Sequence, residues 1–390
     1  MSKQQAKQRA ILCGYYGMGN AGDEALLICL LQSLPEYIEP IVLSNNPAET
    51  HDRYQVKACD RWDLIAVIKE MRQAKVFIWG GGSLMQDNSS RMSPIYYGGL
   101  MKLAQMLGLE TIAWAQGIGP LNHRSNRWLT RHVLKRCQLV TVRDTVSHEM
   151  LQRWGISATI APDPVWAMNA DYSFDLSDES EFGNNQRNYC IVVNLREHSS
   201  LTPDRLEILT QSLIEFQKNN SGFTILLVPF QESLDGKIAR NLHARISRSR
   251  VLSIDNPEVI KGLFGHPDII FTIAMRLHAV IMSISEGCNC FALSYDPKVT
   301  KVMEAAHLTT IVELSEIDST LDKRIAEWVP ELRQTMETGF AYGNPNHGRA
   351  ELEGARQTLI QRATHHHDRL RQVLDKFSSP SILSQKSQKT

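Results

Sequence analysis

The sequence predicts an α/β protein built from two domains, each with a parallel sheet covered by helices on both faces. Three observations support this prediction. Short apolar runs alternate with amphipathic stretches, which is the pattern of a parallel sheet with crossover helices. The alternation is interrupted once, near residue 170, and then starts again. At 390 residues, the chain is also too long for one ordinary hydrophobic core.

The first domain is predicted over residues 1–168. Its strands are expected at residues 10–14, 40–43, 75–79, 111–115, 139–142 and 158–160. Amphipathic stretches at residues 23–34, 62–73, 95–107 and 128–137 are expected to form the covering helices. Because strands and helices alternate, the carboxyl ends of the strands should meet at one edge of the sheet.

Residues 169–189 predict a linker, since they are rich in Asp, Ser and Asn and have no periodicity. The second domain follows over residues 190–345. Its strands are expected at residues 190–195, 224–228, 250–254, 268–272 and 291–294, and its helices at residues 203–217, 234–246, 276–286 and 299–306.

Residues 320–376 have a helical pattern that is broken near residue 345, and the helix over 346–376 is expected to pack on the first domain. Residues 377–390 predict a disordered tail. This helix contains His365, His366 and His367. Consecutive histidines point in different directions on a helix, so a solvated face explains them better than a metal site does.

The composition excludes several classes of protein. Hydrophobic residues make up 43% and charged residues 22%, which is typical of a soluble globular protein. Lys+Arg and Asp+Glu both total 42, so no overall field would attract nucleic acid, and we expect no nucleic-acid partner. One local basic helix face remains open as an alternative, although a solvated face is its more common meaning. It contains Arg124, Arg127, Arg131, Lys135 and Arg136.

The seven cysteines are scattered without a disulfide framework or zinc spacing, so we expect reduced thiols in a cytoplasmic protein. The apolar run near the N-terminus ends at Gly14, which is too short for a signal-peptide core. No segment approaches the ~20 apolar residues that span a bilayer.

The strongest chemical signal is an arginine and a histidine directly after the predicted strand 268–272. Arg276 and His278 stand where an open α/β sheet binds its ligand, beside the exposed amides of a helix N-terminus. Arginine binds carboxylates and phosphates, and histidine carries protons near neutral pH. The pair predicts an anionic substrate and acid catalysis. The structural alternative is a capping arginine and a core histidine.

Two further cations follow neighbouring strands of the second domain. Arg196 follows the strand at residues 190–195, and Lys298 follows the strand at residues 291–294. If the sheet is parallel, Arg196, Arg276 and Lys298 share one edge and offer three positive charges to a small polyanion. The structural alternative is that each arginine forms an ion pair with Glu197 or Glu286. This alternative could account for any one of the three cations, but not for all three together.

A glycine loop, Gly17-Met18-Gly19-Asn20-Ala21-Gly22, follows the first strand and matches G-x-G-x-x-G. A dinucleotide site would also need an acidic residue after the second strand, and none is present there. Asp23 and Glu24 place negative charge where a pyrophosphate would lie, and suit the helix N-terminus instead. We therefore discount a dinucleotide. Further glycine or polar loops, at residues 80–83, 116–120, 143–144 and 163–164, complete a polar rim suited to a sugar-like acceptor.

These motifs resemble the polysaccharide pyruvyl transferase family, specifically enzymes of the CsaB type that act on cell-surface polysaccharides. The matching segments are residues 14–24, 79–84, 116–120, 142–144, 275–278 and 295–299. They occur in the family's order across residues 11–300, so no single short motif carries the match.

The resemblance implies two Rossmann-like domains facing across a cleft, as in the GT-B fold, and an enzyme that transfers pyruvate from phosphoenolpyruvate (PEP) to a sugar diol as a ketal. It implies His278 as the general acid and Arg196, Arg276, Leu277 and Lys298 as the PEP site. The first domain would then face the acceptor. Its expected acceptor residues are Gly17, Asn20, Asp23, Gly81, Gly82, Gln86, Gln116 and Arg143.

No metal or resident cofactor is expected, and PEP is a co-substrate. The expected acceptor is a lipid-linked or nucleotide-linked saccharide of the cell envelope, which would allow transient contact with the cytoplasmic face of the membrane. One alternative is a GT-B glycosyltransferase that uses a nucleotide sugar. Another is a non-catalytic glycan-binding protein.

Overall fold

The chain forms two compact α/β units in the computed structural model, which describes residues 7–88, 90–176, 189–219, 222–317 and 349–378. The first unit takes its described residues from 1–18, 26–164 and 362–390, and the second from 19–25 and 165–361. The linker prediction falls largely on residues 177–188, which lie outside the described residues. The predicted helical stretch at 320–348 and nearly all of the predicted tail lie outside them as well.

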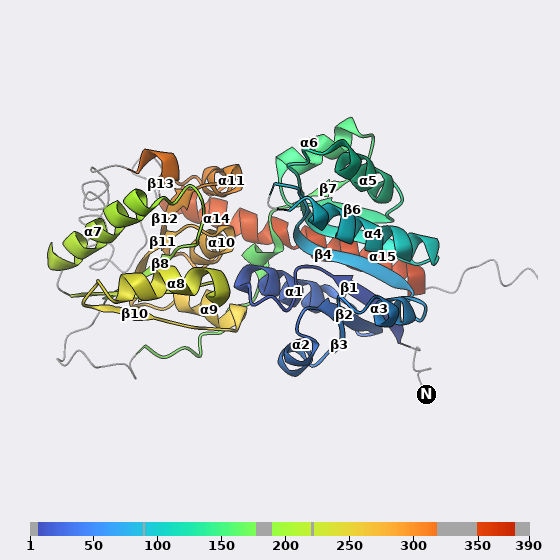
Figure 1. Ribbon diagram of the computed structural model, residues 1–390, viewed down its shortest axis with the longest axis horizontal. Coiled ribbons are helices and arrows are strands. Elements are labelled where there is room, and N and C mark those ends of the chain that lie inside the picture. The colour runs from blue at the N-terminus through green and yellow to red at the C-terminus, as the bar shows by residue number, and fades with distance from the viewer. Residues whose placement is uncertain (1–6, 89, 177–188, 220–221, 318–348, 379–390) are drawn as a thin grey trace, which may run out of the picture. The chain divides into compact units, whose positions relative to one another are not determined.

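The first unit contains a seven-stranded parallel sheet with the order β3-β2-β1-β4-β5-β6-β7. Helices lie on both of its faces (Figure 1). Its strands are β1 (Gln8–Cys13), β2 (Ile38–Ser44), β3 (Lys57–Asp60), β4 (Val76–Met85), β5 (Glu110–Ile118), β6 (Leu139–Val142) and β7 (Thr159–Ile160). Its helices are α1 (Ala21–Ser33), α2 (Pro47–Tyr54), α3 (Leu64–Met71), α4 (Met92–Met106), α5 (Arg124–Leu134) and α6 (Thr145–Arg153), followed by the 3-10 turn η1 (Pro164–Ala167).

The second unit contains a six-stranded parallel sheet with the order β10-β9-β8-β11-β12-β13. Its strands are β8 (Tyr189–Asn194), β9 (Phe223–Leu227), β10 (Ser249–Val251), β11 (Ile269–Ala274), β12 (Asn289–Ser294) and β13 (Ile311–Glu313). Its helices are α7 (Pro203–Asn219), α8 (Glu232–His243), α9 (Pro257–Phe264), α10 (Leu277–Ser285), α11 (Pro297–Ala305) and α14 (Arg349–Ala363). The predicted α/β class with two parallel sheets is confirmed.

Each sheet buries its own apolar core. In the first unit, Ile11, Phe77, Trp79 and Met101 are fully buried between strands and helices. In the second, the core includes Leu213, Ile225, Phe271 and Leu293. Within the described residues, no helix is both long and apolar enough to cross a membrane.

Two short edge strands, β3 and β13, were not predicted, because three or four residues carry too little periodicity. The predicted end of β4 at residue 79 is also wrong. The strand continues through Gly80, Gly81 and Gly82 to Met85, paired with β5. Gly80 is required there because the Tyr16 hydroxyl donates a hydrogen bond to its carbonyl, and a Cβ would collide with that hydroxyl and with Leu30. These glycines therefore permit close packing within a strand rather than forming a turn.

Helix α15 (His365–Ser378) lies against β5 and β6 of the first unit (Figure 1). The predicted solvated histidine face is wrong for His366, which is fully buried. Its Nε2 donates to the Ala161 carbonyl at 3.1 Å, and its Nδ1 lies 2.8 Å from the Thr141 hydroxyl. Because the Ala161 carbonyl can only accept, the proton of the neutral ring is on Nε2, and Nδ1 accepts from the Thr141 hydroxyl, which itself accepts from the Ala115 amide. The neutral ring is thus fully hydrogen-bonded. Burial lowers the pKa of His366 to about 4, despite the opposing charge of Asp163.

This pKa predicts a pH-dependent stability. The unfolded chain protonates His366 below about pH 6.5, while the fold keeps the ring neutral down to about pH 4. The free energy of unfolding should therefore fall as the pH drops through this window, by up to about 3 kcal/mol from this residue. Urea unfolding of wild type and His366→Asn across pH 4–7 measures it. The variant should be less stable at pH 7 but show a shallower pH slope. The exposed His365→Asn is the control, and an unchanged slope in His366→Asn would contradict the assignment.

Candidate active site in the second unit

The second unit brings the predicted cationic residues to one edge of its sheet. The strand order reverses between β8 and β11, and parallel sheets bind ligands outside the carboxyl ends of the strands at such a point. Arg196 follows β8, Arg276 follows β11 and Lys298 follows β12. The predicted shared edge is therefore confirmed, because these three strands are neighbours in the sheet.

Asn194 joins three strand ends at this edge. Its side chain is fully buried, and its Nδ2 donates to the Val228 carbonyl beyond β9 at 2.8 Å. Its Oδ1 accepts from the Arg276 amide at 3.2 Å, and its backbone carbonyl accepts from the Met275 amide at 2.9 Å. The backbone that presents Arg276 is therefore held in place by β8.

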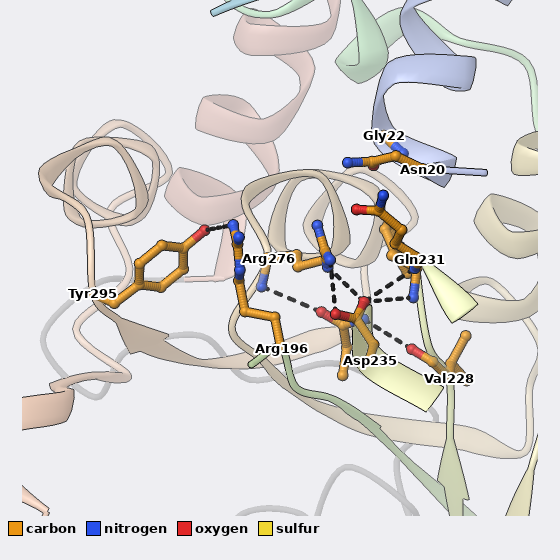
Figure 2. Close-up of polar contacts among 10 residues, drawn as sticks. Asn20, Gly22, Arg196, Val228, Gln231, Asp235, Arg276 and Tyr295 are labelled. Carbon is orange, nitrogen blue, oxygen red and sulfur yellow. Dashed lines mark hydrogen bonds and ion pairs between the residues drawn. The ribbon is translucent and has the colours of Figure 1, made fainter. Parts of the chain in front are cut away.

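The Arg276 side chain is held by a buried carboxylate (Figure 2). Its Nε and Nη2 donate to the two oxygens of Asp235 at 2.6 and 2.7 Å. Asp235, in the first turns of α8, is itself 1% exposed and also accepts from the amides of Phe230 and Gln231. Nη1 is the guanidinium nitrogen that has no partner in the described part of the chain, and it is the one left to meet a ligand.

Pairing of Arg276 with a carboxylate was the alternative considered for this residue, but the partner is Asp235 rather than Glu197 or Glu286. Glu286 instead lies 3.7 Å from the Lys261 ammonium and accepts from the Tyr172 hydroxyl. Asp235 was not identified from the sequence as the partner of Arg276, because an acidic residue in the first turns of a helix is usually explained by its interaction with the helix dipole. The available signal was its spacing, since it shares one helix face with Ile238, Ala239 and Leu242.

Arg196 differs from Arg276 because no described carboxylate neutralises it. Its Nη1 donates to the Tyr295 hydroxyl at 2.9 Å, and its guanidinium carbon lies 5.2 Å from the centre of that ring. Its Nε is buried without a hydrogen-bond partner in the described residues. Figure 2 shows Arg196 and Tyr295 beside the Arg276 and Asp235 pair. The positive charge of Arg196 is therefore not offset by any described carboxylate.

His198 packs against the same tyrosine, with ring centres 4.6 Å apart. Burial lowers the pKa of His198, and the positive charge of Arg196 lowers it further, while Asp296 opposes the shift. Its Nδ1 accepts a hydrogen bond from the Ser200 amide at 3.1 Å. His198 is therefore neutral near pH 7 and adds no positive charge to this edge.

His278 lies in the first turn of α10, directly after Arg276 and Leu277. Its ring packs against the first turn of α1, where a Cβ on Gly22 would collide with Nδ1. The start of α1 is anchored to this unit because the Ala21 amide donates to the Phe230 carbonyl at 2.8 Å. Figure 2 shows the Gln231 side chain extending toward Asn20 and Gly22. Glycine at position 22 therefore makes room for the histidine.

Lys298 is the second residue of α11, where its amide donates to the capping Asp296 carboxylate at 2.9 Å. Its side chain is half-buried. Among the described residues, no group of three His, Cys, Asp or Glu side chains is arranged to hold a metal ion.

The expected acceptor residues fall in both units. Residues 19–25, which include Asn20 and Asp23, belong to the second unit, beside His278. Asn20 caps α1, because its Oδ1 accepts from the Gly22 amide at 3.0 Å. Gly17 belongs to the first unit, with φ +70° and no room for a Cβ against Ser44.

The other expected acceptor residues lie along β4, β5 and β6 of the first unit. Gly81, Gly82 and Gln116 are buried within β4 and β5. Arg143, whose side chain is 6% exposed, pairs with Asp163 and donates to the Ser83 hydroxyl at 3.1 Å. Gln86 is half-buried and caps the Asn88 amide.

Asp87, which was not predicted, ties the loops after β4 and β5 together. Its carboxylate accepts from the amides of Asn122 and His123 at 2.6 and 2.9 Å, and from Asn126 Nδ2 at 3.1 Å. Burial opposes its ionisation, but these hydrogen bonds outweigh burial and lower the pKa of Asp87.

Comparison with known proteins adds a family and a fold. The model of the polysaccharide pyruvyl transferase family matches residues 20–297, which include the second half of the glycine loop, Arg196, Arg276 and His278, but end one residue before Lys298. No curated protein matches the sequence significantly.

Solved structures with a similar fold are distant in sequence. The S. aureus MnaA–UDP structure has a TM-score of 0.60 at 12% identity, covering 93% of this chain and 97% of that one. A putative UDP-N-acetylglucosamine 2-epimerase from Listeria monocytogenes has a TM-score of 0.59 at 10% identity, covering 92% and 98%. A glycosyltransferase from Rickettsia africae has a TM-score of 0.58 at 12% identity, covering 96% and 98%. This likeness shows a GT-B-like α/β fold.

The buried pair predicts a large loss of stability on removal of one partner. Asp235→Asn should lower the free energy of unfolding by about 3–5 kcal/mol, because it leaves the Arg276 charge buried without a partner. Urea unfolding of Asp235→Asn, Arg276→Gln and the double variant measures the coupling, and the double variant should lose less than the sum. Glu232→Gln is the control on the same helix, since its pair with Arg240 is exposed and should contribute under about 1 kcal/mol. Additive losses would contradict the coupling.

Proposed function

The chain belongs to the polysaccharide pyruvyl transferase family, and on this premise we propose that it transfers pyruvate from PEP to a sugar diol as a ketal. The observation that carries this proposal is the carboxyl edge of the second sheet. There, Arg196 has no described counter-ion, Arg276 is oriented by Asp235, and His278 begins the helix that follows Arg276. These groups suit a small substrate with a carboxylate and a phosphate.

In this proposal, three cations bind PEP. Arg196 contributes a full positive charge, because its hydrogen-bond partner is a neutral tyrosine. Arg276 offers Nη1, while its other nitrogens are held by Asp235. Lys298, at the start of α11, adds a third positive charge. Leu277 is the first residue of α10 and lies at the same edge of the sheet. Charge-assisted contacts of this kind are about twice as strong as neutral ones.

His278 is the proposed general acid. It delivers its proton to the methylene carbon of PEP, which becomes a methyl group, and positive charge develops at the adjacent carbon. One sugar hydroxyl attacks that carbon and loses its proton. The bond from the same carbon to the phosphate oxygen then breaks, and phosphate leaves. A second hydroxyl attacks and loses its proton, which closes the ketal. Of the two hydroxyl protons released, one returns His278 to its acid form and one leaves with phosphate.

The neighbouring cations support departure of the phosphate. Charge grows on the leaving oxygens as the bond breaks, and fixed positive groups stabilise it without reorganisation. Asp235 and Asn194 act indirectly, since they hold Arg276 in one orientation before the substrate arrives. No resident cofactor takes part in this proposal.

The proposed acceptor is a lipid-linked or nucleotide-linked saccharide of the cell envelope, modified in the cytoplasm, as in CsaB-type enzymes. Gly17, Gly81, Gly82, Gln86, Gln116 and Arg143 of the first unit are proposed on the acceptor side, with Asn20 and Asp23. The position of Gly22 against His278 supports a role for Asn20 and Asp23 close to the reacting group.

A second candidate function is a glycosyltransferase that uses a nucleotide sugar. It is favoured by the likeness of the fold to a protein solved with UDP and to a glycosyltransferase. Incubation with either PEP or UDP-sugars, together with a panel of cell-wall saccharide acceptors, separates the two. Phosphate release coupled to an acceptor that gains one pyruvyl ketal by mass spectrometry supports the pyruvyl transferase. UDP release with a glycosylated acceptor would replace it. Glycan binding without either release would indicate a non-catalytic protein.

Arg196→Ala should weaken PEP binding by at least about tenfold, because a charge-assisted contact to the anion is lost. Calorimetric titration with PEP measures the affinity. Arg196→Lys keeps the charge and should recover part of the affinity. Arg240→Ala removes an exposed arginine of the same unit and serves as the control. Unchanged affinity in Arg196→Ala would mean that the anion binds elsewhere.

His278→Ala should lower turnover by roughly 10²–10⁴-fold while PEP affinity stays near wild type, because the proton donor is lost but the cations remain. Single-turnover phosphate release and PEP titration on the same sample measure the two effects. Turnover within a few-fold of wild type, in a correctly folded sample, would remove the general-acid role.

Gly22→Ala should lower turnover without unfolding the protein. A Cβ at position 22 would displace the His278 ring, while alanine favours helix α1 by up to about 1 kcal/mol. Kinetics and thermal unfolding of the same sample test this. The control is Gly354→Ala in α14, where a Cβ has open space. Wild-type turnover in Gly22→Ala would show that the position of His278 is not critical.

A further inference from the structure

Helices α4 and α5 expose apolar side chains where a surface helix normally carries polar ones. Met92, Ile95 and Met106 follow helical spacing along one face of α4 and are 63%, 41% and 72% exposed. Trp128 on α5 is 66% exposed. Single exposed apolar residues need no explanation, but a row of them along two packed helices indicates an interaction surface.

The same two helices carry positive charge without any acid. No Asp or Glu occurs in residues 91–106 or 123–137, although the whole chain has equal numbers of acidic and basic residues. Six cations here are exposed, and none forms an ion pair with a described carboxylate. They are Arg91, Arg124, Arg127, Arg131, Lys135 and Arg136. We call these cations and the four apolar residues the α4–α5 surface.

The two helices form one continuous surface. They pack closely, since a Cβ on Gly98 of α4 would collide with Leu129 of α5. Lys102 of α4 lies 3.1 Å from the Nε2 of His132 on α5. The His132 ring in turn stacks on Trp128, with ring centres 5.1 Å apart and planes 18° apart. The apolar row of α4 therefore continues into Trp128 and the arginines of α5.

From this arrangement we propose that the α4–α5 surface docks on an anionic lipid bilayer. Methionine, isoleucine and tryptophan enter the boundary between headgroups and acyl chains, and exposed arginines bind the headgroup phosphates. The loops that Asp87 ties together connect β4 to α4 and β5 to α5, so this surface adjoins those loops. Docking would hold this edge of the first unit near the membrane.

Flotation of the full chain with vesicles tests the proposal, and its outcome does not depend on pyruvyl transfer. Wild type should float with vesicles of equal parts phosphatidylcholine and phosphatidylglycerol, less so at high salt, and hardly at all with pure phosphatidylcholine. The triple variant Arg124→Glu, Arg127→Glu, Arg131→Glu should lose at least about 10²-fold in partitioning. Trp128→Ser should lose several-fold but keep the salt dependence of wild type, because it removes apolar area and no charge.

Matched control variants test whether vesicle binding depends on this surface rather than on the net charge or the general hydrophobicity of the protein. Lys218→Glu, Lys237→Glu, Lys301→Glu makes the same charge change at exposed positions of the second unit, and Leu234→Ser removes an exposed apolar residue there. Both should float like wild type. The proposal is overturned if wild type stays unbound, if the control triple loses as much as the α5 triple, or if the α5 residues bind a single-stranded oligonucleotide but not vesicles.

Discussion

The ion pair between Asp235 and Arg276 is the interaction on which the proposed site depends. Two charges buried at the end of a sheet are tolerated because they neutralise each other, with Asp235 held by four hydrogen bonds and Arg276 by a bidentate contact. Their net effect on stability can be small, but their effect on geometry is large. The pair orients one guanidinium nitrogen, and Asn194 fixes the backbone that carries it. A ligand therefore meets a preorganised cation.

Arg196 complements this arrangement, because no carboxylate in the described part of the chain pairs with it. The Asp235 carboxylate offsets part of the positive charge of Arg276, whereas the partner of Arg196 is a tyrosine hydroxyl and no described carboxylate offsets its charge. The edge thus combines Arg276, whose orientation is fixed by Asp235, with Arg196, whose charge can attract an anion. The neutral His198 packs beside them without altering that balance. This pair of arginines supports the proposed donor, which carries a carboxylate and a phosphate.

The beginning of α1 shows how one glycine can serve two elements. Gly22 lies in a helix, where glycine is unfavourable, yet it leaves the space in which His278 lies. The last glycine of the loop therefore has a structural task of its own, which is to let the starts of α1 and α10 approach each other. The described residues of α4 and α5 add a second property, a basic and apolar surface that we propose docks on an anionic bilayer.

The sequence by itself determined the α/β class, most strands and helices, and the shared edge of Arg196, Arg276 and Lys298, because periodicity and parallel topology are local consequences of residue order. It also contained the motifs of the family. The tertiary structure decided which partners those residues have. Asp235 lies 41 residues from Arg276 in the chain, and His366 lies 225 from Thr141. Such contacts depend on how helices pack on a sheet, which no local pattern encodes, so the counter-ion of Arg276, the buried histidine and the place of Gly22 emerged only from the fold.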